Sequence, residues 1–267
     1  MKEKGDFMKV HEIISSLSEL APFEYAQGWD NVGLLAGSKE KEVSSVFVAV
    51  DATDEVIEKA LECGADMLLT HHPMIFSAMK RVVDDDFIGR RIIKLIKSDM
   101  AYVAMHTNFD IMGMADAAAD ELKLRKCEVL HVTFEDEIAQ AGLGRIGVLP
   151  REMSLRELAD VVKITFHVPT VRIYGDPDTP IMKVAILPGS GRSEIDDAIK
   201  GGADVFITGD VDHHSGIDAL AKGLCVIDAG HYGIEKLFIS YMEEFIGRNL
   251  KGIRVYKEDI KEPFMVV

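Results

Sequence analysis

The sequence contains few cysteines, and their spacing excludes a disulfide framework or a cysteine-based metal site. The three cysteines are Cys63, Cys127 and Cys225, and no two of them have the short separation of metal or redox motifs. Cys63 and Cys225 stand in apolar context beside expected strands, which predicts buried thiols that act as small hydrophobic residues. A sparse, odd number of cysteines also suits a reducing cytosol.

Long apolar runs and clusters of basic residues are lacking as well. No segment approaches the roughly 20 apolar residues that a membrane helix requires. The charged stretch Met1–Val10 lacks the core of a signal peptide. The formal net charge is −15 and no run of lysine or arginine occurs, so nucleic acid is not an expected partner. We expect a cytoplasmic protein that does not enter membranes.

The sequence does contain a regular alternation of short apolar strands and amphipathic helices. Strands are expected at Val46–Val50, Asp66–Thr70 and Ala101–Met105, with helices at Asp54–Cys63 and Asp86–Lys97 between them. This alternation is typical of an α/β fold with a mostly parallel sheet. A chain of 267 residues, 48% of them hydrophobic, can form one large or two modest domains of this kind.

The second half of the sequence repeats the alternation. Its expected strands are Ile146–Leu149, Val171–Tyr174, Val184–Leu187, Val205–Thr208 and Leu224–Ile227. The remaining expected helices are Val10–Leu20, Met114–Leu122, Leu155–Ile164, Ser193–Lys200, Ile217–Ala221 and Gly233–Asn249. Two short expected strands, Ile253–Tyr256 and Phe264–Val267, close the chain.

The two halves also resemble each other residue by residue. Gly64–Thr70 and Gly202–Thr208 both run from Gly-Ala-Asp through three apolar residues to threonine. Farther along each half a histidine stands four residues before an acid, first in His106–Asp110 and then in His231–Glu235. A duplicated α/β unit explains these matches better than chance, although a generic strand–turn pattern accounts for part of them.

Histidines and acids stand just after three of the expected strands. They are His71, His72, His106, Asp110 and His231. In open α/β sheets the carboxyl ends of the strands form the edge where ligands bind. We therefore expect these side chains to converge at one edge of a sheet or of two facing sheets.

The residue types predict two divalent metal ions bound by His71, His72, Asp110, His231 and Glu235. Imidazole nitrogen and carboxylate oxygen are ligands of Fe, Zn, Mn, Co and Ni. Adjacent His71 and His72 point in different directions and so suit two neighbouring ions. If the last helix starts near His231, this residue and Glu235 project from one face of its first turn. Taken alone, Asp110 could instead cap the next helix, and Glu235 could favour a helix N-terminus.

Other polar residues near the strand ends have open roles. His213 and His214 occupy, by the repeat, the position of the first histidine pair, shifted by two or three residues. They could line the same cavity or simply begin a helix. Asp30 could bind substrate or accept hydrogen bonds from its own loop. The turn Gly189–Gly191 is similar to a phosphate loop, but a short glycine turn before a helix is a weak signal for one.

Five segments together carry a family resemblance. They are Trp29–Leu35, Thr70–Pro73, His106–Asp110, Gly209–His214 and Asp228–Glu235. In this order they resemble, over nearly the whole chain, the Nif-three-like dinuclear metal proteins, many of which are named GTP cyclohydrolase I type 2 homologues. The resemblance implies two α/β domains, residues 1–126 with 229–267 and residues 127–228, the same five metal ligands, and a ring-shaped homohexamer. Gly233 departs from the threonine or serine of many relatives, which should leave ligation intact.

The expected function is metal-dependent hydrolysis of a small molecule. The resemblance implies a GTP cyclohydrolase activity, in which the imidazole ring of GTP is opened. His106, His213 and His214 could shuttle protons, because imidazole titrates near neutrality. A phosphoesterase or amidase acting on another metabolite fits the same ligands. The alternative class is a non-catalytic metal protein, such as an iron-handling factor or an assembly partner.

Overall fold

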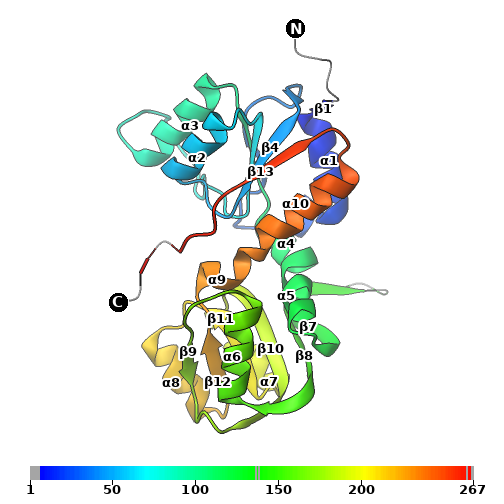
Figure 1. Cartoon of the computed structure of the whole chain (residues 1–267), viewed down its shortest axis with the longest axis vertical. Coiled ribbons are helices and arrows are strands. Elements are labelled where there is room, and N and C mark those ends of the chain that lie inside the picture. The colour runs from blue at the N-terminus through cyan, green and yellow to red at the C-terminus, as the bar shows by residue number, and fades with distance from the viewer. Residues whose placement is uncertain (1–6, 136, 138, 263, 266–267) are drawn as a thin grey trace. The chain divides into compact units, whose positions relative to one another are not determined.

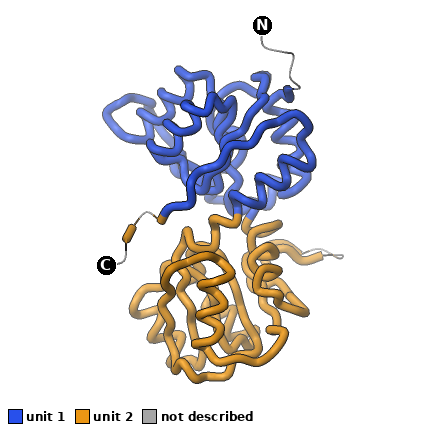
Figure 2. Tube along the Cα trace, in the orientation of Figure 1, with its two compact units in different colours: residues 1–109, 238–261 blue, residues 110–237, 262–267 orange. Residues whose placement is uncertain are grey.

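A computed structural model describes residues 7–135, 137, 139–262 and 264–265. The chain folds into two units, shown in separate colours in Figure 2. Unit 1 comprises Met1–Phe109 and Phe238–Lys261, and unit 2 comprises Asp110–Leu237 and Glu262–Val267. Each unit contains its own sheet. The expected two-part α/β architecture is therefore confirmed.

The unit boundaries fall at other positions than the expected domain boundaries. Unit 1 ends at Phe109 and not at residue 126, because helix α5 (Ala115–Glu121) packs against strands β8 (Gln140–Ser154) and β10 (Pro180–Ser190) of unit 2. On its return, the chain joins unit 1 at Phe238, whereas the expected boundary is residue 229. Both divisions assign the last long helix of the chain mainly to the first unit.

Unit 1 is built on a five-stranded sheet with the order β13-β4-β5-β6-β2. Figure 1 labels β4 and β13 of this sheet. The strands are β2 (Gly33–Ala36), β4 (Ser45–Ala49), β5 (Met67–Thr70), β6 (Ala101–Ala104) and β13 (Arg254–Lys257). β13, β4, β5 and β6 are parallel, and β2 is antiparallel to β6. Every residue of β4, β5 and β6 is buried, as is usual for parallel strands covered on both faces. The other elements of this unit are β1 (Met8–Lys9), β3 (Glu42–Val43), α1 (Val10–Leu20), α2 (Asp54–Glu62), α3 (Phe87–Lys97), α4 (Thr107–Phe109) and most of α10 (Leu237–Asn249).

Unit 2 is built on a six-stranded mixed sheet with the order β7-β8-β10-β11-β12-β9. Its further strands are β7 (Arg125–Glu135), β9 (Arg172–Tyr174), β11 (Val205–Gly209) and β12 (Cys225–Asp228). The three central strands β10, β11 and β12 are parallel, and β7, β8 and β9 are antiparallel to their neighbours. Its further helices are α6 (Leu155–Thr165), α7 (Ile195–Lys200), α8 (His213–Ala221) and α9 (His231–Glu235).

Three details differ from the expectations. β7 is absent from the expected strands because it is an edge strand in which Leu130 is the one buried residue, so its apolar pattern is weak. Cys225 is buried as expected, but the prediction for Cys63 is wrong: it is exposed at the C-terminal end of α2. In the expected strand Phe264–Val267, residues 264 and 265 belong to no strand, and residues 266–267 lie outside the described part.

The duplication expected from the sequence recurs in the hydrogen bonds of the two sheets. Asp66 Oδ2 accepts hydrogen bonds from the backbone N–H groups of Ser44 and Ser45, 22 and 21 residues earlier. Asp204 Oδ2 accepts hydrogen bonds from the N–H groups at the same two offsets. In each unit this aspartate therefore ties the second parallel strand to the start of the first. A generic strand–turn pattern does not require such a shared contact, which supports a duplicated unit.

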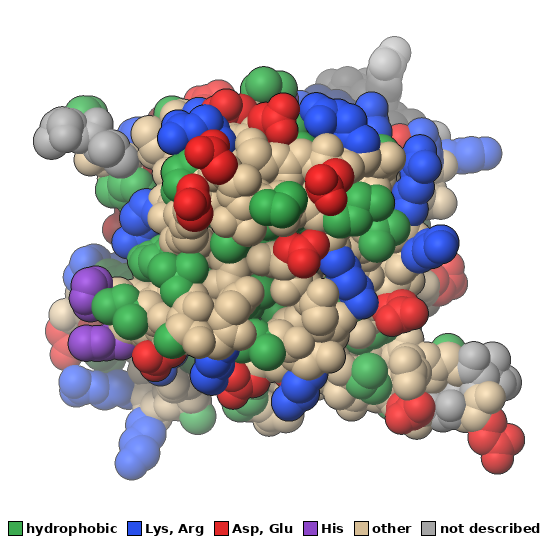
Figure 3. Space-filling model, turned by 90° about the horizontal axis from the view of Figure 1, so that it is seen from below, with side chains coloured by type: hydrophobic (Ala, Val, Ile, Leu, Met, Phe, Trp, Pro, Cys, Tyr) green, Lys and Arg blue, Asp and Glu red, His purple; other side chains and the backbone are tan. Residues whose placement is uncertain are grey.

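Two features of the structure concern its helices and its surface charge. Within the described ranges, no helix has the length and apolar composition needed to cross a membrane. On the face shown in Figure 3, lysine and arginine side chains are interspersed with acidic ones.

Candidate metal centre

The carboxyl ends of the parallel strands of unit 1 carry three of its four histidines, His71, His72 and His106. The register aligns the last residues of β4, β5 and β6 with one another. His71 and His72 directly follow β5, and His106 comes two residues after β6. The convergence predicted at this edge is therefore present among the residues of unit 1.

The imidazole rings of His71, His72 and His106 lie against one another. Ring centroids are 4.8 Å apart for His71 and His72, 5.3 Å for His71 and His106, and 5.5 Å for His72 and His106. One ring nitrogen of each lies within 4.8 Å of the others. His71 is fully buried and the other two are partly buried. Three converging imidazoles of this kind could hold a metal ion.

Each of these rings is oriented by a hydrogen bond of its Nδ1 atom to an oxygen. The three pairs, each 2.9 Å apart, are His71 with the carbonyl of Met105, His72 with Asp51, and His106 with Asp30. Carbonyl and carboxylate oxygens only accept, so Nδ1 carries the proton and donates it. Nε2 is then the nitrogen with a lone pair for a metal. Metal-binding histidines usually have such an oxygen partner on the opposite nitrogen.

Asp30 is held beside His106 by the pairing of β2 with β6. Gly33 pairs with Ala104, which brings the loop before β2 to the segment after β6. Asp30 Oδ2 accepts hydrogen bonds from the N–H (3.0 Å) and the hydroxyl (2.6 Å) of Thr107. Burial raises the pKa of Asp30, but the hydrogen bonds with His106 and Thr107 outweigh burial and lower this pKa to about 2. Asp30 is therefore a carboxylate at neutral pH and orients His106.

The backbone of His72 is also fixed. Its carbonyl oxygen accepts hydrogen bonds from the hydroxyls of Thr70 (2.8 Å) and Tyr102 (3.1 Å). The Tyr102 hydroxyl in turn accepts the N–H of Met74 at 2.7 Å. Burial raises the pKa of Tyr102 to about 12, so this hydroxyl keeps its proton at neutral pH. The turn that carries the histidine pair is therefore rigid before any ion binds.

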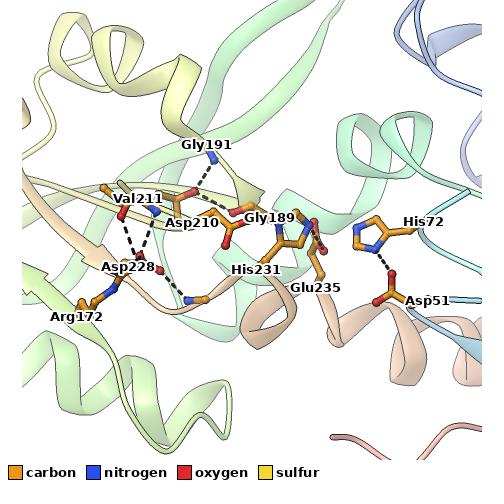
Figure 4. Close-up of polar contacts among 12 residues, drawn as sticks. Asp51, His72, Arg172, Gly189, Gly191, Asp210, Val211, Asp228, His231 and Glu235 are labelled. Carbon is orange, nitrogen blue, oxygen red and sulfur yellow. Dashed lines mark hydrogen bonds and ion pairs between the residues drawn. The ribbon is translucent and has the colours of Figure 1, made fainter. Parts of the chain in front are cut away.

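In unit 2, the start of α9 holds His231 and Glu235. α9 begins at His231, directly after Gly230, whose φ of 77° and ψ of 154° favour glycine. His231 Nδ1 lies 2.8 Å from Asp210, and His231 Nε2 lies 3.1 Å from Glu235 Oε2 (Figure 4). Glu235 is only 3% exposed. The helix thus starts where the sequence prediction required it, with both side chains on one face of its first turn.

The spacing of these two side-chain atoms fits a shared metal ion. Bonds from Zn²⁺ to imidazole nitrogen or carboxylate oxygen are about 2.0–2.2 Å, so two neighbouring ligand atoms lie about 3 Å apart. The Nδ1 atom of His231 is hydrogen-bonded to the carboxylate of Asp210, just as Nδ1 of His72 and of His106 is hydrogen-bonded to a carboxylate. Nitrogen and oxygen donors together suit Zn, Fe, Mn, Co or Ni. The residues present therefore fit the expected ions.

The absence of a side chain at Gly189 leaves space for the carboxylate of Glu235. A Cβ atom on Gly189 would lie 2.2 Å from Glu235 Oε1 and 3.7 Å from His231 Nε2, and the φ of Gly189 is 75°. The N–H of Gly191 in the same turn donates to the hydroxyl of Thr208 at 2.9 Å. The turn Gly189–Gly191 thus packs against the candidate ligands, which gives it a role other than the phosphate loop considered from its sequence.

Asp110 begins an irregular part of a helix. It is the first residue of a π-helical turn, Asp110–Met114, which lies between α4 and α5. π-helical turns are rare and are frequently found at functional sites. Asp110 lies three residues beyond Thr107, the partner of Asp30. Its predicted role as a ligand is not tested by these contacts and stays a prediction.

His213 and His214 lie at the exposed start of α8. Their ring centroids are 5.3 Å apart. Asp212 caps the helix by accepting hydrogen bonds from the N–H groups of His214 and Ser215. This placement matches the simpler of the two roles considered from the sequence, the beginning of a helix. Proton transfer by either histidine stays a prediction.

Sequence reasoning missed the carboxylates behind the imidazoles. Asp51 directly follows the expected strand Val46–Val50, and Asp210 comes two residues after the expected strand Val205–Thr208. The strand-end rule that selected the histidines could therefore have found both. The sequence predicts a proton shuttle at His106, but its ring is oriented by an oxygen at Nδ1 in the same way as the rings of His71 and His72.

Replacing Asp210 with asparagine should weaken metal binding about 10- to 100-fold, the usual effect of losing an oxygen partner behind a ligating histidine. The asparagine can present its amide nitrogen to His231 Nδ1, and the ring then loses its charged acceptor. Competition with a chromogenic chelator measures the change. Asp178→Asn, a substitution at an exposed loop position, is the matched control. Equal affinities for the two variants would remove the proposed role of Asp210.

Nearly the whole chain matches a single protein family. Residues 8–263 match the model of the family described as Duf34/NIF3 (NGG1p interacting factor 3). The chain belongs to this family. The family resemblance carried by the five sequence segments is thereby confirmed.

Similar proteins and solved structures match nearly all of the chain. A Clostridium perfringens protein named GTP cyclohydrolase 1 type 2 homolog is 35% identical over 261 residues, which is 96% of this chain and 99% of that protein. A Streptomyces coelicolor protein of the same name is 35% identical over 257 residues, 93% of this chain and 90% of that protein. A Bacillus cereus protein related to NIF3 superposes with a TM-score of 0.89 at 26% identity, covering 98% of this chain and 100% of that chain. Reduced HcgD from Methanocaldococcus jannaschii superposes with a TM-score of 0.82 at 31% identity, covering 96% and 100%.

Proposed function

We propose that this chain is a metal-dependent hydrolase that holds two divalent ions through His71, His72, Asp110, His231 and Glu235. The observation that carries the proposal is the shared orientation of the imidazoles. His71, His72 and His231 each direct Nδ1 to a fixed oxygen acceptor and keep Nε2 as the metal-binding nitrogen.

His106 is proposed as a sixth ligand in place of its predicted role as a proton shuttle. It forms a group with His71 and His72 whose ring nitrogens lie within 4.8 Å of one another. The charged Asp30 orients it as Asp51 orients His72.

The two proposed carboxylate ligands lie close in sequence to the unit boundaries. Asp110 is bonded to Phe109, the last residue of the first segment of unit 1. Glu235 precedes Phe238, where the chain returns to unit 1, by three residues. The two carboxylate ligands therefore stand at the two points where the chain passes from one unit to the other.

Two bound divalent ions would supply Lewis acidity and water of lowered pKa. The chain's own residues orient the donors: Asp30, Asp51 and Asp210 fix three imidazoles. The printed names of the curated relatives make GTP the first substrate to test. His213 and His214 are candidates for proton transfer, and the homohexamer implied by the resemblance also stays a prediction.

The test begins with metal analysis of the purified protein. The protein is then stripped with a chelator, reloaded separately with Fe(II), Zn, Mn, Co or Ni, and assayed on GTP and on a simple phosphoester. We expect about two ions per chain and turnover that disappears with the metal and returns with it. Two ions without turnover on either substrate would favour a metal-handling protein, and no bound metal would refute the proposal.

His106→Ala separates the two roles of His106 in the same assays. If His106 is a ligand, the variant will hold fewer ions per chain and show no turnover. If His106 is a proton shuttle, the variant will keep its metal content, turn over more slowly and show an altered pH profile of turnover.

A further inference from the structure

Two exposed aromatic side chains of unit 1 lie beside His106. Trp29 is 58% exposed and Phe76 is 54% exposed. Their ring centroids are 5.6 Å apart, with a tilt of 40° between the planes. The ring of His106 lies 5.9 Å from that of Trp29 and 6.4 Å from that of Phe76, and both pairs meet edge to face. The pair therefore adjoins the candidate metal centre.

Both aromatic residues are held in place by their neighbours along the chain. Asp30, next to Trp29, is hydrogen-bonded to His106 and to Thr107. The side-chain amide of Asn31 donates to the carbonyl of Ile75, the residue before Phe76, at 2.6 Å. This bond ties the two loops that carry the rings to each other. These hydrogen bonds fix the two loops, so the aromatic rings stay exposed to water.

Single exposed hydrophobic residues are ordinary on protein surfaces. A rigid pair in mutual contact at a candidate catalytic edge is a different arrangement, because little side-chain freedom remains to be lost when a ligand binds. Aromatic faces attract other planar π systems through stacking, largely without regard to the identity of the ring. The neighbouring imidazoles meanwhile present nitrogen donors for a metal at the edge of the same surface.

We propose that Trp29 and Phe76 form a stacking platform for a planar nitrogen heterocycle of the substrate. The inference rests on the proposed function in one respect, since it assigns the platform to the substrate of the same centre. The platform positions the ring, and the metal ligands act on its edge or on a group attached to it. Trp29 and Phe76 are thus positioning residues that set the substrate class.

The chain provides its own reporter for this proposal, because Trp29 is the one tryptophan in the sequence. Tryptophan fluorescence of the metal-loaded protein is titrated with GTP, guanosine, ribose 5-phosphate and tripolyphosphate. We expect GTP and guanosine to quench the emission in a saturable way. Ribose 5-phosphate and tripolyphosphate lack a planar ring and should leave the emission unchanged. Binding of tripolyphosphate is followed independently by calorimetry.

Trp29→Ala should weaken GTP binding measured by calorimetry about 10- to 100-fold, the range found when a stacking aromatic is removed. Trp29→Phe should restore most of it, and Phe76→Ala should weaken it less than Trp29→Ala. Metal content and binding of tripolyphosphate should stay at the wild-type level in all three variants. Phe87→Ala is the control, because Phe87 is exposed to a similar degree, 52%, but packs under the guanidinium of Arg91.

Several outcomes would overturn the platform. They are an unchanged affinity of Trp29→Ala for GTP, an equal loss of tripolyphosphate binding, absence of quenching by both GTP and guanosine, and shielding of Trp29 from acrylamide in the ligand-free protein. The last result would show that another copy of the chain covers the rings. Absence of turnover with intact, Trp29-dependent binding would instead refute the hydrolase while the platform stands.

Discussion

Glu235→Ala should release at least one of the two ions and abolish turnover. Glu235 is almost fully buried, and its Oε2 atom lies 3.1 Å from His231 Nε2, so no nearby water-exposed group replaces it easily. Losing an oxygen partner behind a ligand costs about 10- to 100-fold in metal affinity, and losing a ligand itself should cost at least that much. Metal analysis after dialysis should give about one ion per chain or fewer.

Glu243→Ala is the matched control for Glu235→Ala. Glu243 is an acid on the adjoining helix α10, but it is half exposed and pairs with Lys257. Exposed pairs of this kind contribute about 0–1 kcal/mol to stability, so this variant should keep its ions and its activity. A Glu235→Ala protein that folds normally and retains two ions would contradict the assignment of Glu235 as a ligand.

Gly189→Ala should produce nearly the same loss without touching any proposed ligand. The added methyl group would lie 2.2 Å from Glu235 Oε1, a separation that no real contact allows. Because Glu235 is buried, its carboxylate can yield only by leaving its position 3.1 Å from His231 Nε2. Alanine at a φ of 75° also costs about 1–2 kcal/mol of stability. We expect a folded protein with a lowered melting temperature and few bound ions.

Gly202→Ala separates the two effects of the alanine. Gly202 has a φ of 71°, close to that of Gly189, but a Cβ there meets no atom within 4 Å. This variant should lose a similar amount of stability in thermal unfolding and keep its ions. Equal metal content in the Gly189→Ala and Gly202→Ala proteins would show that the turn does not position Glu235.

Sequence patterns predict the strand ends of this protein well. Buried parallel strands are short, apolar and bounded by polar residues, so the ends of β5 and β12 can be recognised in the sequence. Histidines stand in the segments after both strands. His71 and His231 could be placed from this pattern alone. The expected helix begins at Gly233, whereas α9 begins two residues earlier, at His231, directly after Gly230 with its φ of 77°.

Tertiary contacts decide what the patterns miss. The expected helix Gly233–Asn249 is in fact two helices, α9 and α10, with a break at Lys236. β7 has few buried residues and pairs only at the sheet edge, so no period marks it. Asp30 reaches His106 because β2 runs antiparallel to β6, a choice of direction that local sequence does not encode. For this reason the role of His106 was judged from its residue type alone.

The π-helical turn at Asp110 has a consequence for how this chain can change during evolution. An α-helix turns about 100° per residue, and a π turn is wider because its hydrogen bonds span five residues instead of four. Deleting one residue from Asp110–Met114 would restore ordinary helical bonding and swing Asp110 by about 100° relative to α5. Selection for a more stable helix would thus act against the direction of this carboxylate. If Asp110 binds metal as proposed, a lineage that abandoned metal binding could lose that residue, and the length of this one turn should then distinguish metal-binding from metal-free descendants.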